Sequence, residues 1–275
     1  NFKLFSSFLL QKMSIRTLQN LDIPTINRIL KDGFEFLSTS LKEKKTAIKF
    51  SSIDTGASWV KNKTVLEIVC PDASQLLLTI ETIFKEHHIR MSRKLHPVYN
   101  IKSEKNTFSI QESSCLDSKK YTYIFISFST KLDPQEIRKL KKKLDFHIKT
   151  IQLIENDRLA IHQEVDSAIQ LSQQQYTHGI KELSHLLYWL RHANFSFFGF
   201  YNSKNQLGLC SKTYAKLDPS LQPLLEQRLK QDQNTSFIFD TIGFTSPVYR
   251  FENLMCLSIK LPKHNENLYF FGLLR

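Results

Sequence analysis

Histidine and cysteine are the side chains that most often bind metal ions, and this sequence spaces them too widely for that role. His185 and His192 lie on one flank of a predicted helix, but a zinc site would need further ligands and none is evident. The cysteines form no Cys-x-x-Cys pair: Cys70, Cys115, Cys210 and Cys256. Isolated thiols of this kind are typical of a reduced cytoplasmic protein. We therefore expect no metal site and a cytoplasmic location.

Acidic and nucleophilic side chains show no catalytic arrangement either. The carboxylates stand singly, without the paired acid and base that proton transfer needs: Asp54, Glu67, Glu112 and Asp117. No Ser, Cys or Lys occupies a nucleophile motif. The 7 glycines are too far apart for either common phosphate-binding loop, G-x-G-x-x-G or G-x-x-x-x-G-K. The sequence thus predicts no catalytic residue and no cofactor-binding residue in this chain.

The net charge of +12 raises the question of a nucleic-acid partner. The densest basic cluster, 138–143, lies on a predicted helix whose apolar positions include Leu140 and Leu144, so it is most simply the solvated face of that helix. A nucleic-acid surface would interleave basic residues with exposed aromatic side chains. The aromatic residues here follow buried-strand patterns instead. We expect no nucleic-acid partner. RNA binding is the least favoured of the three functions that we consider for this chain.

Length and hydropathy are those of a globular chain with two domains. The chain has 275 residues, of which 41% are hydrophobic and 23% charged. No apolar run approaches the roughly 18 residues that span a bilayer. We therefore expect no membrane partner.

The first half of the chain alternates predicted strands and helices. Pro134 stands at the first position of a predicted helix, just after the acidic cap Asp133. The strand–helix–strand–strand–helix–strand order is the ferredoxin-like pattern. In chain order, we expect a helical segment at 1–50, a linker at Ser51–Lys63, strand 64–70, helix 74–88, extended chain at 89–101, a polar loop at 100–118, strand 121–129, helix 133–144 and strand 148–154.

The second half begins with a predicted helix at 156–174. A second helix follows, with apolar residues at spacings of three and four, and Asn194 ends it. The aromatic run Phe195–Tyr201 predicts a buried strand, and Asn202–Asn205 predicts a hairpin turn after it. We expect a polar helix near 219–230 and strands at 236–240, 256–260 and 268–274.

Several short strings follow one another between Trp59 and Arg275. They are Lys63–Val69 (KTVLEIV), His96–Val98 (HPV), Leu187–Leu190 (LYWL) with Asn194–Phe200 (NFSFFGF), Leu207–Leu209 (LGL), Ser246–Arg250 (SPVYR) and Asn267–Leu274 (NLYFFGLL). In this order and spacing they resemble the N-terminal region of the large bacterial NAD-dependent glutamate dehydrogenases. That family deaminates glutamate oxidatively to 2-oxoglutarate with NAD. Its catalytic and NAD-binding segments lie C-terminal to the region that this chain resembles.

The resemblance implies an α+β chain with a ferredoxin-like, ACT-like βαββαβ domain, a connecting helix and a second sensory-type, PAS-like α+β domain. We expect a helical N-terminal arm and linker at 1–58, the ACT-like domain at 59–154, the connecting helix at 155–175 and the second domain at 176–275. The sequence stops inside the last predicted strand, so we expect the second domain to be truncated at its C-terminal end.

ACT domains bind amino acids at the loop between their first strand and first helix, where backbone N–H groups and the helix dipole favour a carboxylate. The matching residues are Asp72, Ala73, Ser74 and Gln75. The other interpretation is a capped helix start, with Asp72 or Ser74 bonding the amides of the first turn. Without a glycine to admit a ligand, we favour the cap and expect weak or absent amino-acid binding.

The sequence departs from the family pattern at the loop Pro71–Thr79, at Asn100–Ser103 and at Tyr249, where the family has histidine. We therefore expect a diverged relative: a non-catalytic regulatory or oligomerisation region, with an amino acid as candidate effector and no cofactor of its own. ACT domains commonly pair edge to edge, so we also expect a homo-oligomer. The alternative is a free-standing small-molecule sensor or adaptor without enzymatic activity.

Overall fold

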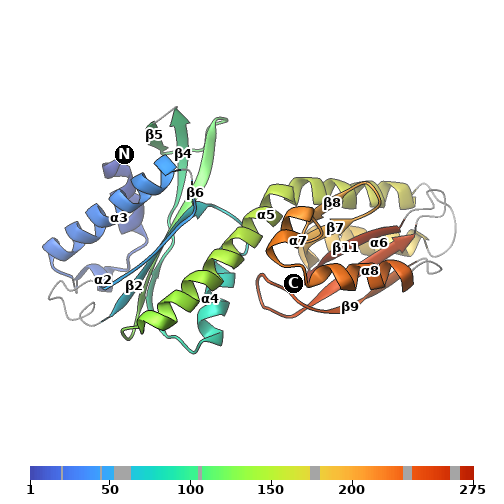
Figure 1. Cartoon of the computed structure of the whole chain (residues 1–275). Coiled ribbons are helices and arrows are strands. Elements are labelled where there is room, and N and C mark those ends of the chain that lie inside the picture. Colours follow the sequence, from blue (N-terminus) through green and yellow to red (C-terminus); the bar gives the residue numbers. More distant parts are fainter. Residues whose placement is uncertain are drawn as a thin grey trace. The chain divides into compact units, whose positions relative to one another are not determined.

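The computed structural model describes residues 1–19, 21–43, 45–52, 63–104, 107–173, 180–231, 237–260 and 267–275. The chain divides into two compact units, each with an antiparallel sheet and helices (Figure 1). Unit 1 comprises Asn1–Asp72 and Ile83–Asp145, and unit 2 comprises Ala73–Thr82 and Phe146–Arg275. The mixed α+β class is as predicted. Trp59 and most of the predicted linker Ser51–Lys63 lie outside the described residues.

The sheet of unit 1 has the order β1-β2-β6-β4-β5, and β3 also pairs with β6. All pairings between its described strands are antiparallel, with Ile68 opposite Ile124 at the centre. The central strand β2 is buried along nearly its whole length, which explains why apolar residues occupy both of its faces, with Glu67 as a buried exception. The strands are β1 (Ala47–Ser52), β2 (Thr64–Pro71), β3 (Met91–Leu95), β4 (Val98–Glu104), β5 (Thr107–Gln111) and β6 (Ser118–Phe128).

Helices α1 (Phe2–Gln11), α2 (Ile15–Gln19) and α3 (Ile23–Glu43) precede this sheet. Phe5 and Leu9 lie four residues apart on α1, so both reach the same core, where they are buried with Leu37 of α3 and with Tyr99 and Tyr123 of the sheet. The N-terminal segment therefore belongs to the core of unit 1. Helix α4 (Leu76–Glu86) follows β2.

Two local predictions in unit 1 are wrong. Residues 47–50, predicted as helix, belong to β1, which pairs with β2 from Ala47↔Val69 to Ser52↔Thr64. Residues 100–118, predicted as a polar loop, contain most of β4 and all of β5, which form a hairpin. β1 and β5 lie at the two ends of the sheet order, and the polar residues of these segments hide the strand pattern. Within the segment 89–101, predicted as extended chain, His96 and Pro97 separate β3 from β4.

The predicted strand at Ile148–Ile154 is also wrong, because α5 is one helix of 40 residues, Pro134–Gln173. The predicted helix 133–144, from Pro134 on, and the predicted connecting helix 155–175, as far as Gln173, are parts of it. Ile148, Ile151 and Ile154 follow one another at intervals of three, which suits a helix face as well as a short strand. No glycine or proline lies between Pro134 and Gly179, so α5 contains no residue that would break the helix after its first position.

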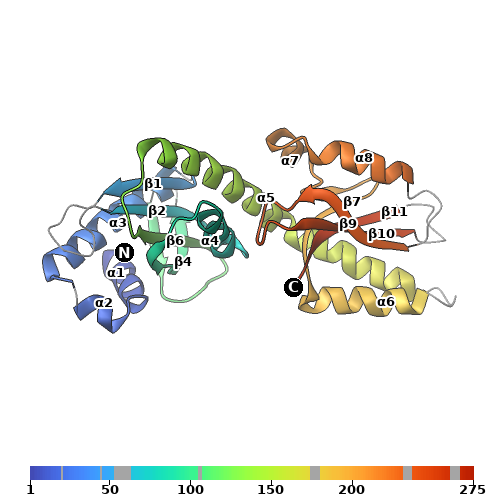
Figure 2. The ribbon, with the colours of Figure 1, turned by 90° about the horizontal axis from the view of Figure 1, so that it is seen from below.

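Unit 2 contains a second antiparallel sheet, of order β8-β7-β11-β10-β9. Figure 2 shows α5 and α6 on one side of this sheet and α7 and α8 on the other. The predicted aromatic strand and its hairpin are present as β7 and β8. The elements are α6 (Ile180–Trp189), the π-helical turn η1 (Leu190–Asn194), β7 (Phe195–Tyr201), β8 (Gln206–Gly208), α7 (Lys212–Leu217), α8 (Leu221–Gln231), β9 (Phe237–Thr245), β10 (Asn253–Lys260) and β11 (Asn267–Leu274).

The core of unit 2 lies between α5, α6 and the sheet. Ile161 and Val165 of α5 are fully buried together with Leu187 of α6 and with Phe200 and Phe270 of the central strands. The rings of Phe200 and Phe270 lie 4.9 Å apart between centroids, within the range of favourable aromatic pairs. This packing fixes the position of α5 on the sheet, and with it the polar residues that α5 presents nearby.

Candidate effector cavity

The predicted effector loop divides into two parts in the structure. The backbone N–H of Asp72 donates to the carbonyl of Lys120 at 2.9 Å, beside the end of β2. The carbonyl of Gln75 accepts the first bond of α4, from the N–H of Thr79 at 2.9 Å. Gln75 itself has φ 66°, in the left-handed region. The helix therefore starts at Leu76, two residues later than predicted.

Ser74 contacts a carboxylate from elsewhere in the chain. Its backbone N–H and its hydroxyl donate to Oε2 of Glu155 on α5, at 3.3 Å and 3.0 Å. Acidic groups are favoured where N–H groups precede a helix, because these groups and the helix dipole carry partial positive charge. An internal carboxylate thus occupies the position that the predicted effector loop would offer to a ligand. The hydroxyl of Ser74 therefore donates to Glu155 and does not form the predicted cap on the first turn of the helix.

Ser74 and Gln75 line a cavity of about 260 Å³ within unit 2, whereas Asp72 and Ala73 are not among its lining residues. One part of the wall is apolar and includes Ile151, Ile154 and Phe195. The side-chain Oε1 of Gln75 is buried and accepts no hydrogen bond from the described residues. A buried acceptor of this kind is costly unless a donor reaches it.

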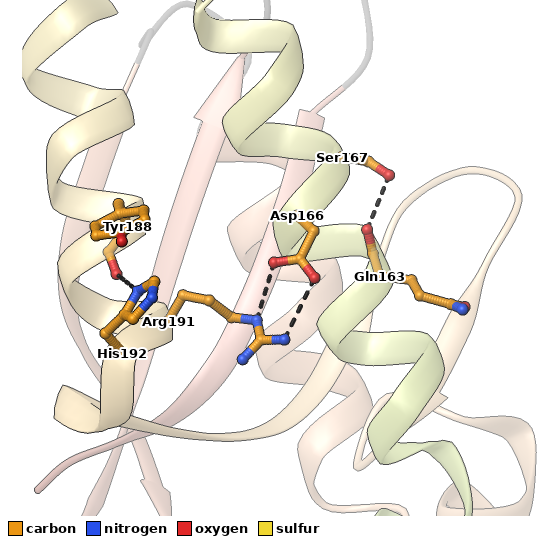
Figure 3. Close-up of polar contacts among 6 residues, drawn as sticks. All are labelled: Gln163, Asp166, Ser167, Tyr188, Arg191 and His192. Carbon is orange, nitrogen blue, oxygen red and sulfur yellow. Dashed lines mark hydrogen bonds and ion pairs between the residues drawn. The ribbon is translucent and has the colours of Figure 1, made fainter.

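Arginine side chains form the other part of the cavity wall. Arg158 is one turn along α5 from Glu155, and its Nε lies 2.7 Å from Oε1 of that residue. Arg191 of η1 also lines the cavity, and its Nε and Nη2 donate to the two carboxylate oxygens of Asp166 at 3.0 Å and 3.3 Å. Figure 3 shows the third nitrogen of this guanidinium directed away from Asp166. Arg275 adds a third cation, with its Nε donating to Oγ of Ser196 at 3.0 Å.

The end of α6 positions Arg191. Ala193 has φ 68°, which breaks the helical path, and the side chain of Asn194 donates to the carbonyl of Trp189 at 2.7 Å. Nδ1 of His192 lies 2.8 Å from the carbonyl oxygen of Tyr188 (Figure 3). These contacts satisfy carbonyl groups that the helix end leaves without an intrahelical partner. The predicted helix stop at Asn194 is thus confirmed, and it has a structural cause.

His162 lines the same cavity. Burial lowers the pKa of its imidazole, and the nearby charges of Arg191 and Arg158 lower it further. The ring is therefore neutral at pH 7, since the ordinary value is already 6.5. It lies 6.0 Å from the ring of Phe197 between centroids. His162 can exchange a hydrogen bond with a bound molecule without adding positive charge.

The arrangement suits binding of a small molecule that carries a negative charge. Guanidinium groups are the strongest neutralising partners for a carboxylate, and the apolar wall suits a hydrocarbon part. In the part of the chain that the structure describes, no three His, Cys, Asp or Glu residues are grouped closely enough to hold a metal ion.

Most of this cavity was missed by reasoning from the sequence. Of the predicted effector residues, Ser74 and Gln75 line it, but Glu155, Arg158, His162 and Arg191 were not predicted. The predicted connecting helix 155–175 already places Glu155, Arg158 and His162 on neighbouring turns of one face. No local pattern shows that this face meets Ser74 and Gln75.

No protein-family model matches this chain, and a search of curated proteins found no match to it. Within the described residues, no helix has both the length and the apolar character that crossing a membrane requires.

Proposed function

We propose that this chain is the non-catalytic N-terminal regulatory and oligomerisation region of a protein similar to the large NAD-dependent glutamate dehydrogenases. The ordered strings between Lys63 and Leu274 support the proposal. The parent reaction would be the oxidative deamination of glutamate to 2-oxoglutarate with NAD, carried out by segments that this sequence does not contain. The observation that carries the regulatory role is the arginine-lined cavity of unit 2.

The sheet orders are compatible with this proposal. Along the chain, β2, α4, β3 with β4, β6 and α5 follow the order of the first five elements of an ACT-like domain. The place of the missing last strand, beside β2, is taken by β1. Numbered from β7, the sheet of unit 2 has the order 2-1-5-4-3, which we interpret as PAS-like. Both types of domain commonly bind small molecules or other protein chains.

The cavity suggests how an α-amino acid could be bound. Its carboxylate would pair with Arg158 and Arg191, and its ammonium group would donate to the buried Oε1 of Gln75. The side chain would contact Ile151 and Ile154. Glu155 opposes this binding, because its own carboxylate already engages Ser74 and Arg158. We therefore expect amino-acid binding by the unaltered chain to be weak.

Replacing Glu155 by alanine tests this competition. In Glu155→Ala, the donors of Ser74 and the Nε of Arg158 become available, and alanine suits the helix interior. We expect L-leucine to bind the unaltered chain with a dissociation constant of about 1 mM or weaker. The variant should bind it about tenfold more tightly, which corresponds to about 1.4 kcal/mol. Isothermal titration calorimetry measures both constants.

The matched control is Glu226→Ala, which removes one carboxylate from an exposed position on α8 in the same unit. This change should leave the dissociation constant of leucine unaltered. Adding Arg191→Gln to Glu155→Ala should reverse the gain. If Glu155→Ala folds normally but binds leucine no better than the control, the cavity is not an amino-acid site.

A purified chain of residues 1–275 should form no NADH from glutamate and NAD, because the sequence has no dinucleotide-binding loop or catalytic group. An absorbance assay for NADH, with a complete glutamate dehydrogenase as positive control, measures this. Glutamate-dependent NADH formation would contradict the proposal.

We also expect self-association, which light scattering during gel filtration measures.

The second candidate is a free-standing sensor or adaptor without an attached enzyme. The same cavity favours it, because a binding site of this kind works equally well alone. The two proposals differ in what the gene encodes after Arg275. A long open frame supports the regulatory region, and an immediate stop codon supports the free-standing module.

A further inference from the structure

A second cavity lies in unit 1, away from the predicted effector loop. Its volume is about 370 Å³, and it lies between the α1–α2 segment, from Lys12 to Leu21, and the strand β3. The inner wall contains Met13, Leu95 and Phe125, all of which are buried. Because β3 and β6 are hydrogen-bonded to each other, this wall is part of the folded sheet.

All the charged residues that line this cavity are basic. Lys12, Arg16, Arg93 and Lys94 line it, and none of its described lining residues is acidic. Lys12 and Arg16 are exposed and form no ion pair with any residue that the structure describes. A bound anion would supply the opposite charge that Lys12 and Arg16 lack among the described residues.

Arg93 places one of these cations partly inside the protein. Burial lowers the pKa of its guanidinium, which means that the charged form has lost part of its hydration. An anion that contacts a partly dehydrated guanidinium gains more than it would at the open surface. Arg93 thus makes the cavity more favourable for an anion than a patch of surface lysines would be.

Hydroxyl groups complete the polar lining. Oγ of Ser14 lies 2.9 Å from Oγ1 of Thr17, and both residues line the cavity. Hydroxyls of this kind donate readily to phosphate oxygens, as Ser and Thr do in many phosphate sites. The combination of arginine, lysine and hydroxyl donors around an apolar wall is that of a site for an organic phosphate.

We propose that the cavity between the α1–α2 segment and β3 binds a small organic phosphate. A phosphate group carries up to two negative charges and several acceptor oxygens, so it compensates several cations at once, whereas a single carboxylate carries one charge. The apolar wall would contact the organic part of the molecule. The proposal is independent of the cavity in unit 2 and of any relation to glutamate dehydrogenase.

Titration with inorganic pyrophosphate tests the charged part of the site, and acetate serves as the carboxylate comparison. Calorimetry of the full chain should show pyrophosphate binding at least about tenfold more tightly than acetate. The double variant Lys12→Gln/Arg16→Gln should weaken pyrophosphate binding by about tenfold or more. Both residues are exposed, so the variant should keep its fold, which circular dichroism checks.

The matched control is Arg138→Gln/Lys142→Gln, which removes the same charges from exposed positions on α5 that do not line the cavity. This variant should bind pyrophosphate as the unaltered chain does. Equal weakening in both double variants would overturn the proposal, because binding would then follow net charge alone. Stronger binding of a single-stranded RNA oligonucleotide, lost in both variants, would overturn it in favour of a nucleic-acid surface.

Discussion

A buried carboxylate in unit 1 shows how single residues constrain this fold. Glu67 on β2 is 4% exposed, and its Oε1 accepts a hydrogen bond from the hydroxyl of Tyr123 at 2.8 Å. Its Oε2 lies 3.0 Å from Nζ of Lys49 on β1. A buried charge is tolerated only when partners replace its lost hydration. The three residues come from three neighbouring strands, so this group ties the edge strand to the centre of the sheet.

Removing the tyrosine hydroxyl should therefore destabilise unit 1. In Tyr123→Phe the Oε1 of Glu67 loses its donor in a site without water access, so we expect the free energy of unfolding to fall by about 1–3 kcal/mol. Denaturant unfolding followed by circular dichroism measures the change. Tyr188→Phe is the control, because Tyr188 is 56% exposed and should change stability by less than about 0.5 kcal/mol. Equal effects in the two variants would contradict the structural role of the hydroxyl.

At the scale of elements, the central strands of unit 2 approach each other closely at a glycine. The register between β7 and β11 shifts between Phe271 and Gly272. A Cβ atom added at Gly272 would overlap the carbonyl oxygen of Ser196 and the ring of Phe195. Glycine at this position is thus required by the pairing of the strands, not by a turn.

Alanine at this position should separate the two strands. We expect Gly272→Ala to lower the free energy of unfolding by about 2 kcal/mol or more, since the overlapping backbone oxygen cannot move without breaking the strand pairing. Gly243→Ala is the matched control in the same sheet, because a Cβ there meets no atom within 4 Å. The control should be neutral or slightly stabilising. A loss at Gly243 equal to that at Gly272 would contradict the steric explanation. Thermal and denaturant unfolding of both variants provide the comparison.

Elements with a strong local signal were predicted correctly, and the others were not. The aromatic strand Phe195–Tyr201 and the turn after it follow from residue types that only suit those structures. The strand β1 and the continuous helix α5 depend on partners far away in the sequence. Ala47–Ser52 becomes a strand because the free edge of β2 is available to it. Ile148–Ile154 stays helical because its apolar face is buried as part of a long helix.

At the scale of the whole molecule, buried tyrosines and thiols make stability depend on alkaline pH. Burial raises the pKa of Tyr99, Tyr123, Tyr214 and Cys210 above the ordinary values of 10.0 for tyrosine and 9.0 for cysteine. Above those pH values the unfolded chain loses these protons while the folded chain retains them. The stability is therefore complete below about pH 8, begins to fall as the unfolded thiol loses its proton near pH 9, and falls further as the pH rises through 10.

We expect the free energy of unfolding to be constant below about pH 8 with respect to these groups and to fall steeply above about pH 10. Each such group contributes up to about 1.4 kcal/mol per pH unit. Denaturant unfolding at several pH values measures the slope. In Tyr123→Phe the free energy of unfolding should fall less steeply with pH, by the contribution of one tyrosine. A stability that does not change up to pH 11 would show that these groups titrate equally in both states.

The amino-acid sequence by itself determined the α+β class, the main strands and helices, and the lack of any phosphate-binding loop or catalytic motif, because these depend on residue types and on spacings within a few residues. Only the tertiary structure decided which charged groups meet. Ser74 reaches Glu155 across 81 positions of sequence, and Arg191 reaches Asp166 across 25. Such contacts depend on how helices pack against a sheet, and a local sequence pattern does not determine that packing.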